Sequence, residues 1–419
     1  MIKIFWLSLI TLSAGLVHAA TTAVIPVSPT TFFGDVENFK SKSLSLQTEK
    51  QNLEATSDLY LSKKFFWTPK LSVSANSTQT KLNSSTSYDA NYIEADLSLN
   101  LFRGGGDWNS MKDASAQKKA QELQVFNEAL RVEAKAADLI FKSLYLIETE
   151  RIQDQLLKLK EESLRIVNDR FQQGRLPLQE VAKSEVDLTQ QRNKLRSAHL
   201  DFVENKSQIS SLFVTDLQTK AWPFTEKVSP RLPTAQRLPL VEQKYWTSES
   251  REEMWKATKA GHWPSLDFTL QYLDTKVKDP TAATSQQYVG LLTLSLPIWN
   301  RYEISAQVSS AYAQYVASAN DLKDTEQTLK QKTIFLKEKI EVARVNLAEA
   351  KKNVEASRKL YQDILRSFRL GRLSTNDLLI EQNRLLDSEN SLALSQLTFH
   401  QGLIETCVLA GYKTSECLQ

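Results

Sequence analysis

Long segments of the chain carry apolar residues at every seventh position. Between Asp107 and Arg170 there is neither proline nor glycine. The apolar seam of this segment runs through Leu123, Leu130, Ala137 and Leu144. Sustained seven-residue spacing is typical of helices that supercoil against a neighbour. A helix of about 64 residues would be roughly 95 Å long, so we expect it to pack along an equally long partner.

The same spacing returns in the second half of the chain. One seam contains Val308, Tyr315, Leu322, Leu329 and Leu336, and a second contains Ile340, Leu347, Val354, Tyr361 and Phe368. Two further ladders are offset by 197 residues: Val181, Leu188, Leu195, Phe202 and Ile209, followed by Leu378, Leu385, Leu392 and Phe399. This offset indicates an internal duplication.

A repeated glycine motif interrupts each half between its two helical ladders. It reads F-x-x-G-R-L at residues 171–176 and again at 368–373. An acidic residue follows four positions after the leucine, Glu180 in the first copy and Asp377 in the second. Because glycine favours helix ends, we expect each copy to be the point where two long helices reverse direction.

Shorter segments show strict alternation of apolar and polar residues, which is typical of β-strands with one apolar face. Residues 69–102 form the first such hairpin, and residues 264–298 form the second. Leu292, Leu294, Leu296 and Ile298 are predicted in the last return strand. Ser-, Thr- and Asn-rich residues 77–90 and the Asp279-Pro280 pair mark the two loops.

The predicted order of segments is helix, hairpin, long helix, turn and long helix, written twice. Residues 1–19 are expected to be a signal peptide, because a short apolar stretch precedes small residues Val17 and Ala19. The remaining boundaries are as follows: first repeat 20–215, with a hairpin at about 69–102 and helices at about 107–170 and 177–213; linker 216–237; second repeat 238–419, with a hairpin at about 264–298 and helices at about 301–368 and 375–410.

Composition adds three constraints. With 11 glycines and 11 prolines in 419 residues, long uninterrupted elements are favoured. The net charge of +3 comes without a basic block, which argues against nucleic-acid binding. Cys407 and Cys417 are the only cysteines; export makes a disulfide plausible, and two free thiols are the alternative.

The hairpins have the length of membrane-spanning strands, which need about 9–11 residues. Four tryptophans lie at the helix-proximal strand ends, as expected of an aromatic belt at a membrane interface: Trp67, Trp108, Trp263 and Trp299. No segment after the signal peptide has the ~18–20 apolar residues of a transmembrane helix. Four strands cannot close a barrel, so a membrane barrel would need several chains, and three would give twelve strands. Two soluble hairpins are the alternative.

The ordered, duplicated set of hairpins, long helices and glycine turns resembles the TolC-like outer-membrane efflux proteins. The resemblance covers essentially the whole chain after residue 19. It implies a mainly α fold with a transmembrane β part, in which a homotrimer forms a twelve-stranded β-barrel continued by an α-helical barrel in the periplasm. It also implies the outer membrane of a Gram-negative bacterium, contact with its lipid, and docking to a periplasmic adaptor and an inner-membrane transporter.

The resemblance assigns roles to residues around the two turns. The adaptor-docking tips would be Gly174, Arg175 and Leu176 in the first half and Gly371, Arg372, Leu373 and Ser374 in the second. Glu180 and Asp377 match the acids that close the periplasmic mouth, whereas Ile380 falls where a second acidic ring is expected. Phe368 stands where the family often has a tyrosine, so a hydroxyl-based lock with Glu180 is unavailable.

Closure would then depend on packing and on ion pairs of Arg366, Arg369 or Arg372. The alternative role of Glu180 and Asp377 is to stabilise helix N-termini, with Ser374 or Thr375 as the cap.

Candidate chemistry is otherwise absent from the sequence. Gly104-Gly105-Gly106 lacks the lysine and hydroxyl of a phosphate loop, and the histidines have no ligand-spaced partners. We therefore expect no enzyme activity, no cofactor and no metal. The predicted function is a channel for efflux or type I secretion. A structural or adhesive coiled-coil protein of the envelope is the alternative, and an adaptor is disfavoured because adaptors lack the duplication.

Overall fold

The computed structural model describes residues 29–82, 86–213, 219–231, 238–277, 285–299 and 302–418, so the predicted signal peptide lies outside the described residues. The helices are α1 (Pro29–Lys42), α2 (Leu44–Lys64), α3 (Gly106–Gln172), α4 (Leu178–Phe213), α5 (Pro239–Lys259), α6 (Glu303–Arg369), α7 (Thr375–Ala410) and α8 (Thr414–Cys417), with a 3-10 turn η1 (Ala260–His262). The strands are β1 (Lys70–Leu82), β2 (Thr86–Arg103), β3 (Ser265–Val277) and β4 (Ser285–Ser295).

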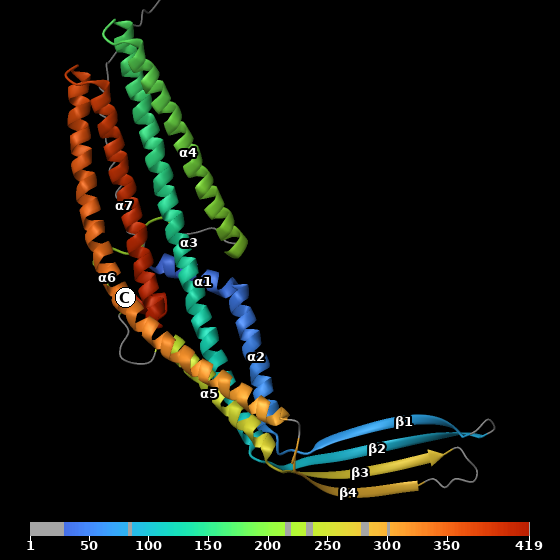
Figure 1. Cartoon of the computed structure of the whole chain (residues 1–419). Coiled ribbons are helices and arrows are strands. Elements are labelled where there is room, and N and C mark those ends of the chain that lie inside the picture. The colour runs from blue at the N-terminus through green and yellow to red at the C-terminus, as the bar shows by residue number, and fades with distance from the viewer. Residues whose placement is uncertain are drawn as a thin grey trace, which may run out of the picture.

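The molecule is a long helical rod with a β-sheet projecting from one end (Figure 1). The antiparallel pairs α3/α4 and α6/α7 lie side by side, in the order α6, α7, α3, α4 across the rod. Nearer the sheet, α5 takes the place of α7, and α2 flanks α3. The prediction of a mainly helical fold with duplicated β-hairpins and duplicated long helical hairpins is confirmed.

The long helices bury much of the apolar seams that the seven-residue spacing predicts, whereas Leu123, Val308, Tyr315 and Leu322, nearer the sheet, are only partly buried. Helices α3 and α6 each contain 67 residues, which corresponds to roughly 100 Å. In α3, Leu130, Ala137 and Leu144 are buried, and in α6 the seam is buried from Leu329 to Phe368. The equally long partner that we expected is not found among the described residues. Helices α4 and α7, of 36 residues each, pack along α3 and α6 on the side of the tips, and α5, of 21 residues, packs on both nearer the sheet.

The largest core lies halfway along the rod, where α1 packs on α3 and residues of α7 join the same cluster. Phe32, Val36 and Phe39 of α1 join Phe141 of α3 in this core. The ring of Phe32 stacks on that of Phe141, with centroids 5.2 Å apart. Asp35 of α1 accepts hydrogen bonds from the backbone N–H and hydroxyl of Thr219, at 2.9 and 2.7 Å. We call this region the equatorial core.

The sheet is antiparallel, with the strand order β1-β2-β3-β4. Its cross-strand register places Leu71 opposite Leu97 and Leu97 opposite Leu270, so one face of the sheet is apolar. On the other face Ser72 lies opposite Asp96 and Asp96 opposite Gln271.

Two irregularities limit the alternation in the strands. A register shift between Asn100 and Phe102 interrupts the β2–β3 pairing. Strand β4 ends at Ser295, before Leu296 and Ile298, which we expected in the strand. Pro297 has no N–H to donate to the ladder, which is the physical reason. Among the described residues no helix has both the length and the apolar character needed to cross a membrane.

His400 generates a prediction about pH. Its ring is buried in the equatorial core, with Nδ1 2.7 Å from the Gln396 carbonyl and Nε2 3.1 Å from the Phe224 carbonyl. Burial lowers the pKa of His400 to about 4, although both carbonyls act in the opposite direction. The unfolded chain therefore binds a proton below pH ~6.5 that the folded chain takes up only near pH 4. We expect stability to fall by about 2 kcal/mol between pH 7.5 and pH 5.

Thermal melting of the detergent-solubilised protein at the two pH values measures this loss. A His400→Gln variant should reduce the dependence on pH. His199, whose side chain is exposed, provides the matched control, since His199→Gln should leave it unchanged. An equal effect of the two substitutions would contradict the assignment to His400.

Candidate functional site at the helix tips

The two glycine turns have the same backbone hydrogen bonds. In the first, the N–H of Gly174 donates to the Phe171 carbonyl at 2.9 Å, and the N–H of Arg175 donates to the Arg170 carbonyl at 2.9 Å. In the second, Gly371 donates to Phe368 at 2.9 Å and Arg372 to Ser367 at 3.0 Å. This is the Schellman motif that ends many helices.

The glycines are required by backbone conformation rather than by space. Gly174 has φ +70° and Gly371 has φ +75°, and an added Cβ would meet nothing within 4 Å at either position. The left-handed conformation costs a residue with a side chain roughly 1–2 kcal/mol. The sequence motif therefore specifies a turn that projects into open space at the end of each hairpin.

The second turn continues into a capped helix. Ser374 Oγ accepts a hydrogen bond from the Asp377 N–H at 3.2 Å, and Asp377 Oδ2 accepts from the Ser374 N–H at 3.0 Å. The Ser374 hydroxyl also donates to Asp377 Oδ2 at 2.7 Å. These hydrogen bonds, the side-chain one first, hold the pKa of Asp377 below its usual value. Asp377 thus forms the capping box that the alternative interpretation expects.

Glu180 lies at the corresponding place in the first turn of α4. Its N–H donates to the Pro177 carbonyl at 3.1 Å. Over the part of the chain that the structure describes, its carboxylate has no ion pair. The two acids therefore differ: Asp377 is held by its own cap, whereas the carboxylate of Glu180 is available to another group.

Phe368 lies inside the tip and not on its surface. Its side chain is 0% exposed and packs in a cluster with Val167, Val181, Tyr361 and Leu378. Residues from α3, α4, α6 and α7 meet in this cluster, so it joins the two hairpins of one chain. Phe171, the counterpart of Phe368 in the first turn, is 39% exposed.

Arg170 connects the two turns directly. Its guanidinium lies 4.1 Å from the centroid of the Phe368 ring and donates a hydrogen bond to the Phe368 carbonyl. Its own carbonyl accepts the closing hydrogen bond of the first turn, from Arg175. One residue therefore takes part in the C-terminal caps of both α3 and α6.

Two other contacts cross between the hairpins near the tip. Arg369 pairs with Glu162 of α3 at 2.6 Å, and Lys183 of α4 donates to Asn376 Oδ1 of α7 at 2.8 Å. Arg366 pairs within α6, with Asp363 at 3.8 Å. In the described residues none of these arginines, nor Arg372, pairs with Glu180 or Asp377 within the chain.

The sequence alone did not indicate Arg170, Glu162 or Lys183. Each acts through a partner about 190–210 residues away. Spacing along one helix carries no such information. The duplicated motif itself offers one signal, because Arg170 and its counterpart Ser367 precede the two phenylalanines and differ in type.

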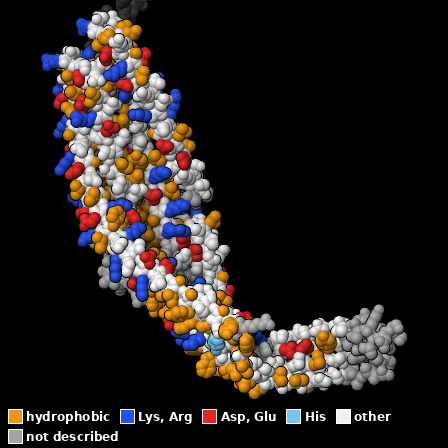
Figure 2. Space-filling view, viewed as in Figure 1, with side chains coloured by type: hydrophobic (Ala, Val, Ile, Leu, Met, Phe, Trp, Pro, Cys, Tyr) orange, Lys and Arg blue, Asp and Glu red, His pale blue; other side chains and the backbone are white. Residues whose placement is uncertain are grey.

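The four tryptophans predicted at the membrane interface lie at the junction of the helices and the sheet. Trp67 precedes β1, Trp108 lies in the first turn of α3, Trp263 precedes β3 and Trp299 follows β4. All four are more than half exposed. Figure 2 shows hydrophobic side chains gathered at this junction, whereas charged side chains are scattered over the helical rod.

The described part of the chain contains no cluster of three or more His, Cys, Asp or Glu residues suited to a metal ion. The candidate sites considered for function are the turns, the edges of the helical layer and the apolar face of the sheet.

Comparison with known proteins gives a consistent result. Residues 36–213 and 234–405 match the profile of a family described as outer membrane efflux protein. The fold is similar to those of CusC (TM-score 0.81, 12% identity, 92% of this chain and 93% of that one), the Campylobacter jejuni outer membrane channel CmeC (0.78, 15%, 92% and 87%) and the Neisseria gonorrhoeae outer membrane channel MtrE, solved in an open state (0.75, 17%, 94% and 91%). No curated protein sequence matches the chain.

The glycine turns generate a prediction about stability. Gly174→Ala should lower the melting temperature modestly, because its cost is limited to the left-handed backbone, about 1 kcal/mol. Gly411, at the end of α7, has a similar φ of +76°, but an added Cβ would lie 2.4 Å from Pro239 Cγ. Gly411→Ala should therefore be clearly more destabilising, and Gly174→Asn should be nearly neutral.

Thermal melting of the three variants under one set of conditions separates the two causes. Equal losses for Gly174→Ala and Gly411→Ala would contradict the view that the tip turn is sterically open.

Proposed function

The chain belongs to the outer membrane efflux protein family, and we propose that three copies form a conduit across the outer membrane that serves a tripartite efflux or type I secretion system. In this proposal the sheets form the membrane barrel, and the helical rods extend into the periplasm. The tips open when an adaptor and its inner-membrane transporter dock.

The single observation that carries the proposal is a pair of matched apolar edges. Helices α4 and α6 lie at opposite edges of the four-helix layer (Figure 1). Leu200 and Val345 are 67% and 53% exposed, and each lies 26 residues from the glycine of its own tip turn. Val203 and Val342 are also exposed, each 29 residues from its glycine.

The exposed apolar residues of α4 and α6 lie at equal distances from the tips, which favours contact between α4 of one copy and α6 of another. Because the helices rise about 1.5 Å per residue, side chains at equal distances from adjacent tips lie within about one turn of the same height. Exposed apolar residues in register on two different edges suit a head-to-tail interface, which closes into a ring. Val186 of α4 and Leu360 of α6 extend the match, at 12 and 11 residues from the two glycines.

The sheet supports the same assembly. Its edge strands β1 and β4 each have one side without a partner in the four-stranded order. An open sheet edge cannot face lipid, because its N–H and C=O groups would lack hydrogen bonds. Pairing β4 of one copy with β1 of the next would satisfy both edges, and three copies would give twelve strands with the apolar face outward.

The turns are well placed to contact an adaptor. Gly174, Arg175, Gly371 and Arg372 are all exposed at the free end of the rod. Leu176 and Leu373 are partly buried, and Leu176 packs against the cluster around Phe368. With Ser374 capping α7, the docking surface would consist of rigid turns and not of flexible loops.

The contacts between hairpins suggest how the tip stays closed. Arg170 on Phe368 and Arg369 on Glu162 both hold α6 against α3 within one chain. We propose that these contacts replace the tyrosine-based lock that Phe368 cannot make. Glu180, whose carboxylate is unpaired within the described chain, would face the neighbouring copy. Arg366 and Arg372 are two of the exposed cations near the same level. Asp377 would serve mainly as a helix cap.

A structural or adhesive coiled-coil protein was the alternative. Membership in a family of outer membrane efflux proteins favours the channel.

Cysteine cross-linking tests the proposed trimer. A Leu200→Cys/Val345→Cys double variant should form disulfides between chains, because both positions lie 26 residues from the tips. Native Cys407 and Cys417 are bonded to each other and should not interfere. Denaturing electrophoresis without reductant should show dimer and trimer bands. Leu200→Cys with Leu360→Cys is the matched control, since these levels differ by 15 residues and should not cross-link. Cross-links in the control alone would overturn the register.

Conductance tests the proposed closure. Arg170→Ala removes the cation–π contact and the hydrogen bond to the Phe368 carbonyl, together worth about 1–2 kcal/mol. Single-channel recording without an adaptor should then show an open probability about tenfold higher.

Arg170→Lys should lie between wild type and Arg170→Ala, because lysine keeps the charge but not the planar group. Arg151→Ala is the control, because Arg151 is an arginine of the same helix that pairs with Glu148 inside α3, away from the tip. Identical behaviour of Arg170→Ala and Arg151→Ala would exclude Arg170 from the closure.

A further inference from the structure

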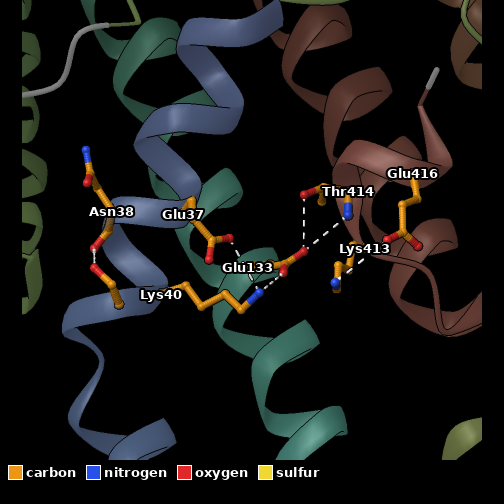
Figure 3. Close-up of polar contacts among 8 residues, drawn as sticks. Glu37, Asn38, Lys40, Glu133, Lys413, Thr414 and Glu416 are labelled. Carbon is orange, nitrogen blue, oxygen red and sulfur yellow. Dashed lines mark hydrogen bonds and ion pairs between the residues drawn. The ribbon is translucent and has the colours of Figure 1, made fainter.

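A buried carboxylate joins three elements in the equatorial core. Glu133 of α3 accepts a hydrogen bond on Oε1 from Lys40 Nζ of α1, at 2.8 Å (Figure 3). Its Oε2 accepts from the N–H and the hydroxyl of Thr414, both at 3.2 Å. The Glu133 side chain is only 4% exposed. A buried carboxylate needs such partners, because removing one leaves an uncompensated buried charge.

One of these partners stands on an element that cannot be stable alone. Thr414 is the first residue of α8, a helix of four residues. A single turn does not offset the cost of helix nucleation. Its position must therefore come from other contacts.

The disulfide between Cys407 and Cys417 supplies the strongest of these contacts. It joins the last residue of α8 to α7 and closes a loop with a sequence separation of 10 residues. Thr414 lies within that loop. The N–H of Arg231 also donates to the Cys417 carbonyl at 3.2 Å, which attaches the 219–231 segment to the same loop.

We propose that the Cys407–Cys417 disulfide is a latch that places Thr414 on Glu133, so that docking of α8 and α1 on α3 depends on thiol oxidation. Oxidation narrows the range of positions open to residues 408–416. The Thr414 donors are then held where the Glu133 carboxylate needs them, and Lys40 completes its coordination from the other side.

The burial of the sulfur atoms sets the order of events. Cys407 and Cys417 are 0% and 3% exposed and belong to the equatorial core. A protein oxidant could not reach them there, so the bond forms before α8 docks. The partner implied is a thiol–disulfide oxidoreductase.

The disulfide would form by thiol–disulfide exchange with this oxidoreductase. One thiolate of the chain attacks the partner's disulfide and releases a partner thiolate, and the second thiolate of the chain then resolves the mixed disulfide. Two electrons and two protons pass to the partner, which leaves as a dithiol.

Hydrogen exchange on the full-length chain in detergent tests the latch. In a Cys407→Ser/Cys417→Ser variant, the peptide that contains the Thr414 amide should exchange about a hundredfold faster, the factor expected for opening a loop of about ten residues. Exchange in α1 should also accelerate. The N-terminal part of α7, around Leu385, should be unchanged and serves as the internal reference.

If the serine variant does not accumulate in cells, hydrogen exchange can be compared between oxidised and reduced wild-type protein. The wild-type protein, reduced with a phosphine after purification, should show the same acceleration at Thr414 and in α1. In a Glu133→Gln background, loss of the disulfide should accelerate α1 less, because no buried charge is left without its partners. Unchanged exchange at Thr414 and in α1 after reduction would overturn the proposal. None of these readouts requires channel activity or a trimer.

Discussion

The burial of apolar seams along two very long helices, α3 and α6, is the constraint on which the rest of the structure depends. A helix of 67 residues with a continuous apolar seam cannot bury that seam in a compact domain. It needs neighbours along its whole length: α4 and α7, of 36 residues each, pack along α3 and α6 on the side of the tips, and α5, of 21 residues, packs on both nearer the sheet. The arrangement is a flat layer of helices and not a closed bundle, so it leaves an edge at α4 and another at α6. The apolar residues on those edges follow directly from this geometry.

The sheet at the other end of the rod also has two open edges. Its four strands satisfy one another but leave the outer sides of β1 and β4 open, and its apolar face is uncovered. The helical layer therefore ends in two different helices, α4 and α6, and the sheet ends in two different strands, β1 and β4. Each of these edges is open to contact with another copy. A single rotation that joins α4 to α6 of a neighbour would also join β1 to β4. This shared requirement is a stronger argument for a ring of copies than either surface alone.

Periodicity allowed much of this fold to be predicted. The seams through Leu130 and Leu144, the reversal at Gly174 and the two hairpins all depend on local spacing, which the sequence displays directly. Interactions between distant segments were not predictable in the same way. Glu133 is one acid among many on a charged helix, and nothing in its neighbourhood indicates that Lys40 and Thr414 will meet it. The end of β4 was missed because the apolar alternation continues past Pro297, although the hydrogen-bonded ladder does not.

The two copies of F-x-x-G-R-L show what duplication preserved and what it did not. Their backbones make the same hydrogen bonds, because glycine and helix geometry dictate them. Their phenylalanines differ completely, since Phe171 is exposed and Phe368 is fully buried beneath Arg170. In a flat layer the two hairpins cannot have equivalent surroundings, because α6 packs on α7 at one edge while α3 lies in the middle with neighbours on both sides. Arg170 can therefore reach the second turn, whereas Ser367 has no side chain long enough to return the contact. The repeated motif determines the backbone conformation of both turns. The different surroundings of the two hairpins determine that Arg170, beside the first turn, contacts Phe368 in the second, and that within the described residues no equivalent contact runs the other way.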